Sequence, residues 1–395
     1  MRIVVGLSGG VDSSVAAALL QEQGHEVIGL YMRNWHDESV TIDNACPWID
    51  DANDAMLVAS HLGIPFQVID LSDAYKQRIV DVMFAEYAAG RTPNPDVLCN
   101  REIKFDIFLQ AALELGAEAV ATGHYCQRSE QATATGMMYS LRAGADANKD
   151  QSYFLCQLTQ GQIQYARFPI GHLQKSEVRE EARRLGLPTA EKKDSQGLCF
   201  VGKVKLPTFL QQQLEVKPGR IIEIPADHPK LAERLRERQE NLFIDATPIQ
   251  WNPEDGVDVG EHPGAHFFTI GQRKGLNVGG KAEPLFVIGR DVATNHLYVG
   301  QGGRHPGLFR RALRIRNEDM HWIRPDIAAQ FDTAGQMAFE VRFRYRQPLR
   351  PAELRSGADG FVYLVFDEDQ TGIASGQFAA WHTGDECIGS GTIAD

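Results

Sequence analysis

The richest chemistry in this sequence lies in a short turn, residues 8–14, with the sequence SGGVDSS. An apolar run at 3–5 precedes it and an alanine-rich run at 15–20 follows it, which predicts a strand, a turn and a helix start. A helix start aims unpaired backbone N–H groups and the positive end of the helix dipole at one point. The glycines let the backbone approach an anion, the hydroxyls can bind phosphate oxygens, and Asp12 can hold a phosphate-bound Mg²⁺. We therefore expect a phosphate site; the alternative is an ordinary turn with Asp12 or Ser13 as the helix cap.

The same turn matches neither of the two common nucleotide signatures. It contains no G-x-x-x-x-G-K-S/T and no G-x-G-x-x-G, so a GTPase-type loop and a dinucleotide site both lose support. SGGVDS instead resembles the pyrophosphate loop of the ATP pyrophosphatases, which adenylate a carbonyl oxygen and cleave ATP to AMP and pyrophosphate. That resemblance implies ATP, with Mg²⁺, as the nucleotide.

Two of the six cysteines stand where a thiol can become reactive. Cys99 ends a proline-stiffened loop, 92–98, and precedes the helical segment 101–115, whose dipole would favour the thiolate. Cys199 follows Lys192, Lys193 and a glycine-containing turn, an accessible and electropositive setting. A single cysteine is more often an inert buried residue, so position alone does not decide either assignment. The cysteine spacing predicts neither a disulfide scaffold nor a metal site.

Length and composition indicate a protein of two or three domains. A chain of 395 residues is too long for one typical core, and its apolar content of 43% and charged content of 23% are ordinary for a globular protein. No apolar run approaches a membrane span, and the start MRIVVGLSGG already reads as structure rather than as a signal peptide. We expect a cytoplasmic protein with no membrane partner, and a monomer.

Positive charge is concentrated in one part of an acidic chain. The net charge of −12 argues against a nucleic-acid partner, but residues 301–350 hold ten Arg, no Lys and five acidic residues, a local charge of +5. Much of this charge falls on alternate positions of predicted strands, which would line one face of a sheet. These positions are Arg310, Arg311, Arg314 and Arg316, then Arg342, Arg344, Arg346 and Arg350. We interpret the face as a surface for a phosphate backbone; the alternative is a solvated strand face.

The first half of the chain alternates apolar strands with amphipathic helices. Strands are expected at 2–7, 25–32, 66–71 and 118–122, and helices at 13–23, 51–62, 73–89, 103–115 and 175–186. This order predicts an α/β domain whose parallel sheet is covered on both faces and binds ligands at the carboxyl ends of its strands. The phosphate turn, Met32 and the segment 122–124 follow such ends, so we expect them to be neighbours.

After Pro207 short β runs dominate, at 220–224, 266–270, 285–290, 296–300, 337–346 and 360–366, with one amphipathic helix at 230–240. One or two small β-barrels are expected. We divide the chain into an ATP pyrophosphatase domain at 1–206, a small central β domain at 207–284 and a C-terminal β-barrel at 285–395.

From Gly6 to the C-terminus the chain resembles the tRNA-specific 2-thiouridylases. The stretches that carry the resemblance are GLSGGVDSSV, TPNPDVLCNREIKF, ATGHY, KDQSYFLCQL, KKDSQGLCF, FFTIGQRKGLNVGG and RFRYRQ. The resemblance implies an adenine-nucleotide alpha-hydrolase-like fold with a pyrophosphate loop, followed by two small β-rich domains. The chain departs from the pattern between Ile224 and Gly256, where about thirty residues, including Trp251, replace an expected tight turn. This insertion, about 225–255, would either pack on the central domain or serve as a docking site.

Carried over position by position, the resemblance assigns three groups of residues. ATP would be held by Gly6, Leu7, Ser8, Gly9, Gly10, Val11, Asp12, Ser13, Met32 and Gly123. The target uracil would be contacted by Asn94, Pro95 and Asp96, with Asp96 handling a proton and Cys99 and Cys199 forming the catalytic sulfur pair. The tRNA would also be contacted by His124, Lys149, Asp150, Gln151, Arg344, Tyr345 and Gln377. Two alternatives stay open: Lys149 to Gln151 could cap a helix that begins at Ser152, and Tyr345 could belong to the barrel core. Cys46, Cys126, Cys156 and Cys387 match no role and are expected to be bystanders.

The implied reaction replaces the C2 oxygen of the wobble uridine by sulfur. Adenylation makes the oxygen a leaving group, a Cys199 persulfide delivers sulfur, and a transient disulfide between Cys99 and Cys199 results. The implied partners are tRNAs that read Lys, Glu and Gln codons, and a cysteine desulfurase or sulfur-carrier protein. Two rival functions remain, another adenylating ligase or amidotransferase with the same loop, and a catalytically silent tRNA-binding protein.

Overall fold

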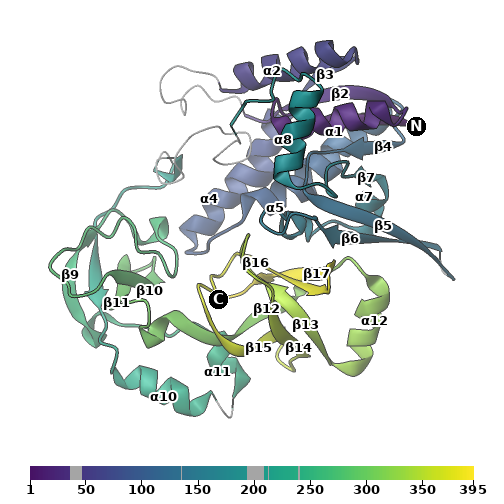
Figure 1. Cartoon of the computed structure of the whole chain (residues 1–395). Helices are drawn as coiled ribbons and strands as arrows, with labels where there is room; N and C mark the ends of the chain where they lie inside the picture. Colours follow the sequence, from purple (N-terminus) through teal and green to yellow (C-terminus); the bar gives the residue numbers. More distant parts are fainter. Residues whose placement is uncertain (36–46, 135, 194–208, 212, 239–240) are drawn as a thin grey trace.

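The computed structural model describes residues 1–35, 47–134, 136–193, 209–211, 213–238 and 241–395 (Figure 1). Its N-terminal unit is built on a five-stranded sheet of order β3-β2-β1-β4-β7, and all neighbouring strands in it are parallel. The strands are β1 Arg2–Gly6, β2 Glu26–Arg33, β3 Phe66–Asp70, β4 Ala119–Ala121 and β7 Ala166–Arg167. The expected parallel sheet is therefore confirmed.

Helices cover both faces of this sheet. They are α1 Val11–Glu22, α2 Pro47–Leu62, α3 Ser72–Tyr75, η3 Lys76–Val80, α4 Asp81–Ala88, α5 Pro95–Cys99, η4 Asn100–Ile107, α6 Phe108–Glu114, η5 Ser152–Leu155, α7 Gln160–Tyr165 and α8 Lys175–Arg184. Strand β1 shows why two layers form. Ile3 and Val5 pack in one apolar cluster with α1 and α2, whereas Val4 packs in another with α4 to α6, because successive side chains of a strand point to opposite faces.

An antiparallel hairpin that the sequence did not reveal links this unit to the C-terminal barrel. It consists of β5 Cys126–Thr133 and β6 Gly136–Ala143, and β6 pairs with β17 Glu386–Ile393. The hairpin thereby extends the sheet of the barrel. Strand β5, with the polar run QRSEQ, lacks the alternating apolar pattern by which half-buried strands are found in a sequence, whereas β6 alternates Tyr139 and Leu141 with Ser140 and Arg142.

The central unit is a four-stranded sheet of order β10-β11-β8-β9. Its elements are β8 Gly219–Glu223, η6 Pro253–Asp255, β9 Val257–His262, η7 Ala265–Phe267, β10 Leu285–Asp291, β11 His296–Gln301 and η8 Pro306–Leu308. The strand expected at 266–270 is absent, because the chain forms the short helix η7 and turns there. Since β10 and β11 belong to this sheet, we propose that the central domain extends through Gln301, beyond the boundary expected at 284.

The insertion folds onto the central sheet and touches the barrel. It carries α10 Pro229–Glu237 and α11 Leu242–Ala246. Leu231 and Trp251 are buried in one apolar cluster with residues of β8, β10 and β11. On its other side, the Asp245 carboxylate accepts a hydrogen bond from the backbone N–H of Arg311 at 2.8 Å. Of the two expectations for the insertion, packing on the central domain is the one observed.

The C-terminal unit is a closed six-stranded barrel, in which β12 pairs with both β15 and β17. Its strands are β12 Phe309–Trp322, β13 Gln336–Arg342, β14 Arg350–Ser356, β15 Phe361–Thr371, β16 Phe378–Thr383 and β17. A helix, α12 Pro325–Ala334, was not expected from the sequence. Strand β13 ends at Arg342 instead of reaching 346, and Arg346 has a φ of +62°, a turn conformation. The expected fold class, an α/β domain followed by two small β-rich domains, is confirmed.

No helix in the described ranges is long and apolar enough to cross a membrane.

Candidate functional site

The phosphate turn joins β1 to α1 and is held open by its own backbone and hydroxyls. The backbone N–H of Ser8 donates to Ser13 Oγ at 3.1 Å, and the Ser13 hydroxyl donates to the carbonyl of Gly10 at 3.2 Å. Gly9 has a φ of +71°, and a Cβ there would lie 2.2 Å from the carbonyl oxygen of Asp51, so only glycine fits. The helix cap is Gly10, without a side-chain cap, so neither Asp12 nor Ser13 is the N-cap. The first N–H groups of α1 therefore lack a side-chain cap.

Two segments expected beside this turn lie against it. A Cβ on Gly123 would stand 2.7 Å from the backbone of Asp12 and Ser13, so the loop after β4 packs directly on the start of α1. A Cβ on Gly6 would be 3.6 Å from the end of Met32 and 3.5 Å from the ring of Phe108. The segment after β4 therefore meets the phosphate turn as expected, whereas Met32 lies within β2, one residue before its end, and not in a loop after it.

A lysine and a tyrosine that the sequence did not single out bind Asp12. The Lys175 ammonium, at the start of α8, lies 2.7 Å from Asp12 Oδ1, and the Tyr125 hydroxyl donates to the same oxygen at 2.8 Å. The Lys175 side chain is only 13% exposed and that of Asp12 is 32% exposed. The carboxylate next to the predicted phosphate site is thus already oriented, and a cation stands beside it.

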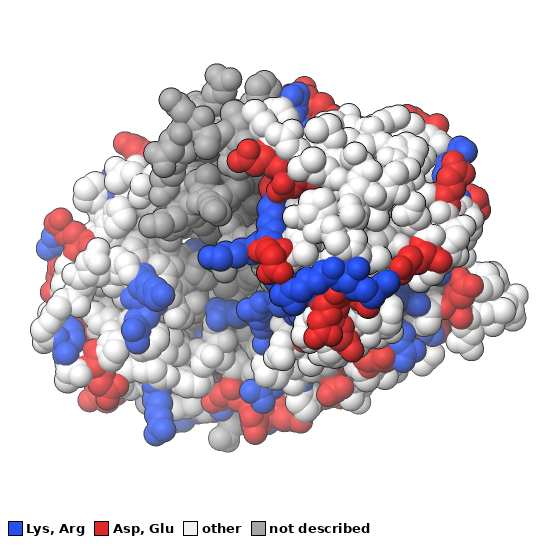
Figure 2. All heavy atoms as spheres, turned by 45° about the horizontal axis from the view of Figure 1, so that its top comes forward, with Lys and Arg blue, Asp and Glu red and all other residues white. Residues whose placement is uncertain are grey.

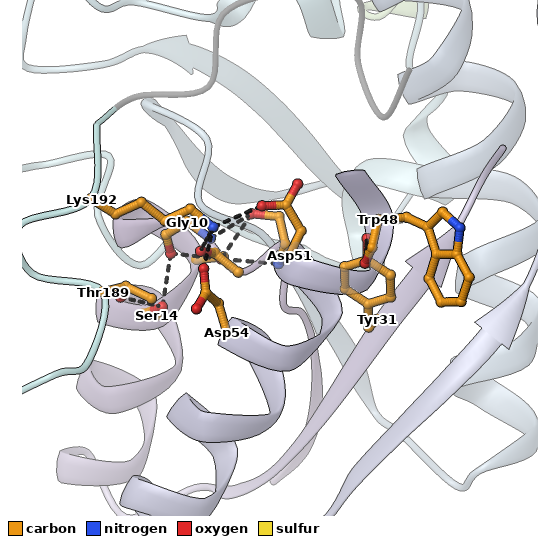
Figure 3. A network of polar contacts seen from close by, with 11 residues as sticks. Gly10, Ser14, Tyr31, Trp48, Asp51, Asp54, Thr189 and Lys192 are labelled. Atoms are coloured by element: carbon orange, nitrogen blue, oxygen red, sulfur yellow. Dashed lines mark hydrogen bonds and ion pairs between the residues drawn. The ribbon is translucent and has the colours of Figure 1, made fainter. Parts of the chain in front are cut away.

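A second lysine spans the turn and α2 (Figure 3). The Lys192 ammonium donates to the carbonyl of Gly9 at 2.9 Å and to Asp51 at 2.7 Å, and it also pairs with Asp54. Burial alone would lower the pKa of Lys192, but the hydrogen bonds to the two carboxylates raise it above its ordinary value. Nearby, the hydroxyl of Thr189 donates to Ser14 Oγ at 3.0 Å. From the sequence, Lys192 was expected only to accompany Cys199; the structure places it on the phosphate turn.

The residues around the turn fit a Mg²⁺ that is held mainly by phosphate. Across the described part of the chain, no three His, Cys, Asp or Glu side chains form a cluster that could hold a metal ion alone. Magnesium in nucleotide sites needs only one or two protein carboxylates, because phosphate oxygens and water complete its shell. Asp12 is placed to be that carboxylate.

The loop predicted to contact the uracil opens helix α5. Asn94 is the N-cap, its Oδ1 accepting from the backbone N–H of Val97 at 3.3 Å, and Pro95 occupies the first helical turn. Asp96, half-buried, also lies in this first turn. Cys99 ends α5 and is fully buried. The helix therefore starts before Cys99, not after it as expected, and Cys99 is the fifth residue of α5.

A π-helical segment follows the cysteine directly. It is η4, Asn100–Ile107, within which Phe105 departs from helical dihedral angles. Such segments are rare and are frequent at functional sites. The Asn100 side chain donates to the carbonyl of Phe154 at 3.1 Å, and Arg101 donates to Gln157 at 2.8 Å. The helix that carries Cys99 is thus fixed by the segment that begins at Lys149.

Cys199 lies outside the described residues, as does Cys46, but both ends of the segment around Cys199 are placed. Lys192, seven positions earlier, is bound to the phosphate turn. Phe209, ten positions later, is buried in the same apolar cluster as Cys99, and its ring stacks on that of Phe84 at 5.4 Å between centroids. The two described flanks therefore lie at the phosphate turn and in the large apolar cluster that also contains Cys99.

Three further cysteines are free and buried, namely Cys126, Cys156 and Cys387. Burial raises the pKa of Cys156 to about 12 and raises the pKa of the other two well above the ordinary range. At neutral pH these thiols are protonated and so are poor nucleophiles.

Lys149, Asp150 and Gln151 lie at the junction with the barrel. Asp150 is 4% exposed, pairs with Arg342 at 2.8 Å and accepts the backbone N–H of Ser152 at 3.0 Å. The N-cap residue of η5 is Gln151, and η5 has no side-chain cap. Gln151 binds Tyr125 through both its backbone N–H and its side-chain oxygen. Lys149 is half-buried. Of the three residues, only Gln151 stands at the cap position of η5, and its side chain binds Tyr125 instead of the helix end.

The other positions assigned to tRNA differ widely in exposure. His124 is 8% exposed, lies between the rings of Phe105 and Phe168, and its Nδ1 is 2.7 Å from the Thr122 hydroxyl. Burial, together with the nearby charge of Lys104, holds the pKa of His124 well below its ordinary value. This ring is a neutral, internal group in the described structure.

Tyr345 and Arg344 occupy the turn after β13. Tyr345 is half-buried against Phe154 of η5, with 4.5 Å between ring centroids, so it packs between the domains and not in the barrel core. Arg344 is exposed and approaches the carbonyl of Ile270 at 3.4 Å. Gln377, half-buried, binds the loop before α5.

The arginines of the barrel do not form one continuous strand face. Arg314 and Arg316 do alternate on the outside of β12, between the buried residues Leu313 and Ile315. Arg310 turns inward, and its guanidinium donates to the carbonyls of Ala246 and Ile373 at 3.0 Å each. The expectation of two regular basic rows is therefore wrong. Figure 2 nevertheless shows Lys and Arg side chains gathered around a hollow near the centre of one face.

Three family models match the chain in order. They are a tRNA methyl transferase HUP domain over residues 1–203, a tRNA methyl transferase PRC-barrel domain over 246–301, and an aminomethyltransferase beta-barrel domain over 312–393. Among solved structures, a 4-thiouridine synthetase–RNA complex with bound ATP is similar to this chain with 17% sequence identity and a TM-score of 0.31. The matched region covers 54% of this chain and 50% of the synthetase chain. That likeness is too low to carry an argument.

Two curated proteins match from end to end. The chain is 58% identical over 396 residues to the tRNA-specific 2-thiouridylase MnmA of Flavobacterium johnsoniae and 56% identical over 396 residues to that of Christiangramia forsetii, covering 100% of each chain in both cases. Given this identity along the whole sequence, the chain belongs to the tRNA-specific 2-thiouridylase family.

Proposed function

We propose that this protein replaces the C2 oxygen of a tRNA uridine by sulfur, using ATP to activate the oxygen. The observation that carries the proposal is that both described flanks of the Cys199 segment are fixed in this domain, Lys192 on the phosphate turn and Phe209 in the large apolar cluster that also contains Cys99. The phosphate turn, Cys99 and Lys192 all belong to the α/β domain, and Phe209 packs in its core.

ATP is the nucleotide that the phosphate turn suits. The start of α1, with Gly9 and Gly10 at the turn, supports binding of the leaving pyrophosphate by backbone N–H groups. Lys175 and Lys192 add two cations beside the same turn, where charge develops on the leaving group. Mg²⁺ bound with ATP would supply further charge neutralisation next to Asp12. The uracil O2 would then attack the α-phosphorus, with release of pyrophosphate.

Sulfur transfer would follow on the adenylated base. In the proposed step, the outer sulfur of a Cys199 persulfide attacks C2 and AMP leaves with its oxygen. The Cys99 thiolate then attacks the inner sulfur, Cys199 Sγ, and the bond between this sulfur and the sulfur on C2 breaks. The products are 2-thiouridine and a Cys99–Cys199 disulfide. A thiol reductant restores the pair, and a cysteine desulfurase or sulfur-carrier protein restores the persulfide. Release of hydrosulfide by Cys99 before attack gives the same products.

The tRNA must present an extruded base to this site, because a stacked uridine cannot reach ATP at the sheet edge. The loop from Asn94 to Asp96 is stiffened by two prolines and by its cap, which suits contact with an unstacked uracil. The barrel would meet the tRNA backbone, where Arg314 and Arg316 are directed outward. We place the reaction in the cytoplasm, on a monomeric enzyme, with tRNAs reading Lys, Glu and Gln codons as substrates.

The test is nucleoside mass spectrometry of tRNA incubated with the protein, ATP, Mg²⁺, cysteine and a cysteine desulfurase. We expect 2-thiouridine in the wild-type reaction and none without ATP. Cys99→Ser and Cys199→Ser should each abolish 2-thiouridine while pyrophosphate release continues. Cys387→Ser, which changes a buried bystander thiol, is the matched control and should thiolate normally.

The two rival functions give different results in the same experiment. Full turnover by Cys199→Ser would favour an adenylating ligase or amidotransferase. Absence of pyrophosphate release from ATP and unmodified tRNA would favour a silent tRNA-binding protein. Either result would overturn the proposed reaction.

A further inference from the structure

All three domains meet at Thr92, in the loop before α5. This loop and the start of α5, residues 92–96, contain the positions predicted to contact the uracil and are called the uracil loop below. The backbone N–H of Thr92 donates to the carbonyl of Ser375 in the barrel at 2.8 Å. Its hydroxyl accepts from the guanidinium of Arg290 at 3.0 Å and lies 3.4 Å from the hydroxyl of Thr269, both in the central domain. Thr92 itself is 8% exposed. A loop of the catalytic domain is therefore held by residues that lie 177 to 283 positions later in the chain.

The amide of Gln377 contributes most of the contact from the barrel. Its Nε2 donates to the carbonyls of Thr92 at 2.8 Å and Pro93 at 3.1 Å, and its Oε1 accepts from Asn94 Nδ2 at 3.4 Å. A primary amide has two N–H donors, so both donors of Gln377 are directed into the loop. Gly376 allows this approach, because a Cβ there would lie 3.0 Å from the backbone of Thr92.

The contact with Asn94 affects α5 directly, because Asn94 is the N-cap of the helix that bears Asp96 and Cys99. Asn94 caps α5 through its Oδ1, and an amide side chain whose nitrogen is bound has its oxygen direction fixed as well. The first turn of α5 holds Asp96, and its last residue is Cys99. Gln377 therefore orients the cap of the helix that would present both groups to the base.

We infer that Gln377 is a positioning residue, through which the barrel fixes the uracil loop and α5 for the reaction. The inference rests on the proposed function for what α5 does, but not for the contact itself. It departs from the resemblance, which makes this residue a tRNA contact. Because the barrel holds the loop through these hydrogen bonds, the barrel must be docked on the catalytic domain before the base can be aligned with Cys99.

The test compares Gln377→Met with Gln370→Met. Gln370 is a buried glutamine of β15 that donates to the carbonyl of Glu368 at 2.9 Å, within the barrel, so its variant loses a hydrogen bond without touching the loop. Amide hydrogen exchange of the peptide 92–99 should become about tenfold faster or more in Gln377→Met, as loss of two hydrogen bonds predicts, and should not change in Gln370→Met.

Activity measurements separate positioning from substrate contact. Gln377→Met should lower the single-turnover rate of 2-thiouridine formation about tenfold to a hundredfold, because small misplacements of reacting groups have effects of that size. Its Kd for tRNA should stay within about twofold of the wild-type value. Gln377→Glu keeps the side-chain shape and an acceptor but loses both N–H donors. It should show the same loss of single-turnover rate as Gln377→Met.

Unchanged exchange of the peptide 92–99 in both Gln377 variants would overturn the inference, whatever the activity. A Kd for tRNA raised tenfold with an unchanged single-turnover rate would also overturn it and restore the role of tRNA contact. A wild-type protein that makes no 2-thiouridine would refute the proposed function alone, since the exchange measurement would still decide whether Gln377 holds the loop.

Discussion

The buried ion pair between Asp150 and Arg342 gives a quantitative prediction for how the catalytic domain and the barrel are joined. The two side chains are 4% and 10% exposed and meet at 2.8 Å. Removing one partner of a buried pair typically costs about 3–5 kcal/mol, because the other charge stays desolvated. In Arg342→Met, the Asp150 carboxylate would keep the N–H groups of Gly144 and Ser152, so we expect about 3 kcal/mol.

The reverse substitution should be the more damaging. In Asp150→Asn the Arg342 guanidinium, whose Nε already has no partner, would lose its counter-charge, so we expect about 4–5 kcal/mol. The double variant removes both charges and should cost less than the sum of the two.

The assay is scanning calorimetry of the intact chain, in which we expect Arg342→Met to lower Tm by roughly 4 °C. Binding of tRNA, measured below the transition, should keep its wild-type Kd in both single variants. Suppose instead that neither variant moved Tm by more than a degree while both weakened tRNA binding tenfold. Asp150 would then be a substrate contact, as the family resemblance implies, and the domain-joining role would be refuted.

Two further predictions concern the phosphate turn and the barrel core. Asp12→Ala should lower the rate of pyrophosphate release about tenfold or more with an unchanged Kd for tRNA, because it removes the carboxylate that Lys175 and Tyr125 orient. A pyrophosphate assay and filter binding measure the two properties, and an equal loss of both would contradict the assignment of the phosphate site. Burial beside Arg342 lowers the pKa of His382 from 6.5 to about 4, so between these pH values the unfolded chain takes up a proton that the folded chain does not. The free energy of unfolding should therefore fall by up to about 1.4 kcal/mol per pH unit as the pH drops from 6.5 to 4. Calorimetry of His382→Gln should show a shallower fall.

The catalytic domain was the predictable part of the fold, for a physical reason. Fully buried parallel strands appear as short apolar runs, and their helices carry one apolar face, so β1, β2 and β3 were placed within a residue or two. The start of α5 was missed although Asn94 followed by Pro95 is a helix-start signal, an N-cap with proline in the first turn. That signal was available in the sequence and was overlooked.

Other features depend on tertiary placement and left no local pattern. The sequence RFRYRQ alternates like a strand, yet the chain turns after Arg342, where Tyr345 packs against Phe154 of another domain. Lys175 and Lys192 are ordinary lysines in the sequence, and only the fold brings their ammonium groups to the phosphate turn. A local pattern describes which face of an element is apolar, but not which charged side chains converge from distant segments.

The segment from Lys149 to Gln157 shows why a recognised motif does not by itself assign a role. The family resemblance implies tRNA contact for Lys149 to Gln151, yet Asp150 pairs with Arg342 of the barrel. Later in the same segment, the Gln157 amide donates to Ser390 Oγ at 2.7 Å. The same segment orients Tyr125, and through it Asp12 at the phosphate turn. A substitution here would move the barrel and the nucleotide site together, so lost thiolation alone cannot identify a tRNA contact. Only a change in Kd for tRNA, with Tm unchanged, would separate contact from assembly, and for the buried members of the segment we expect the opposite pattern.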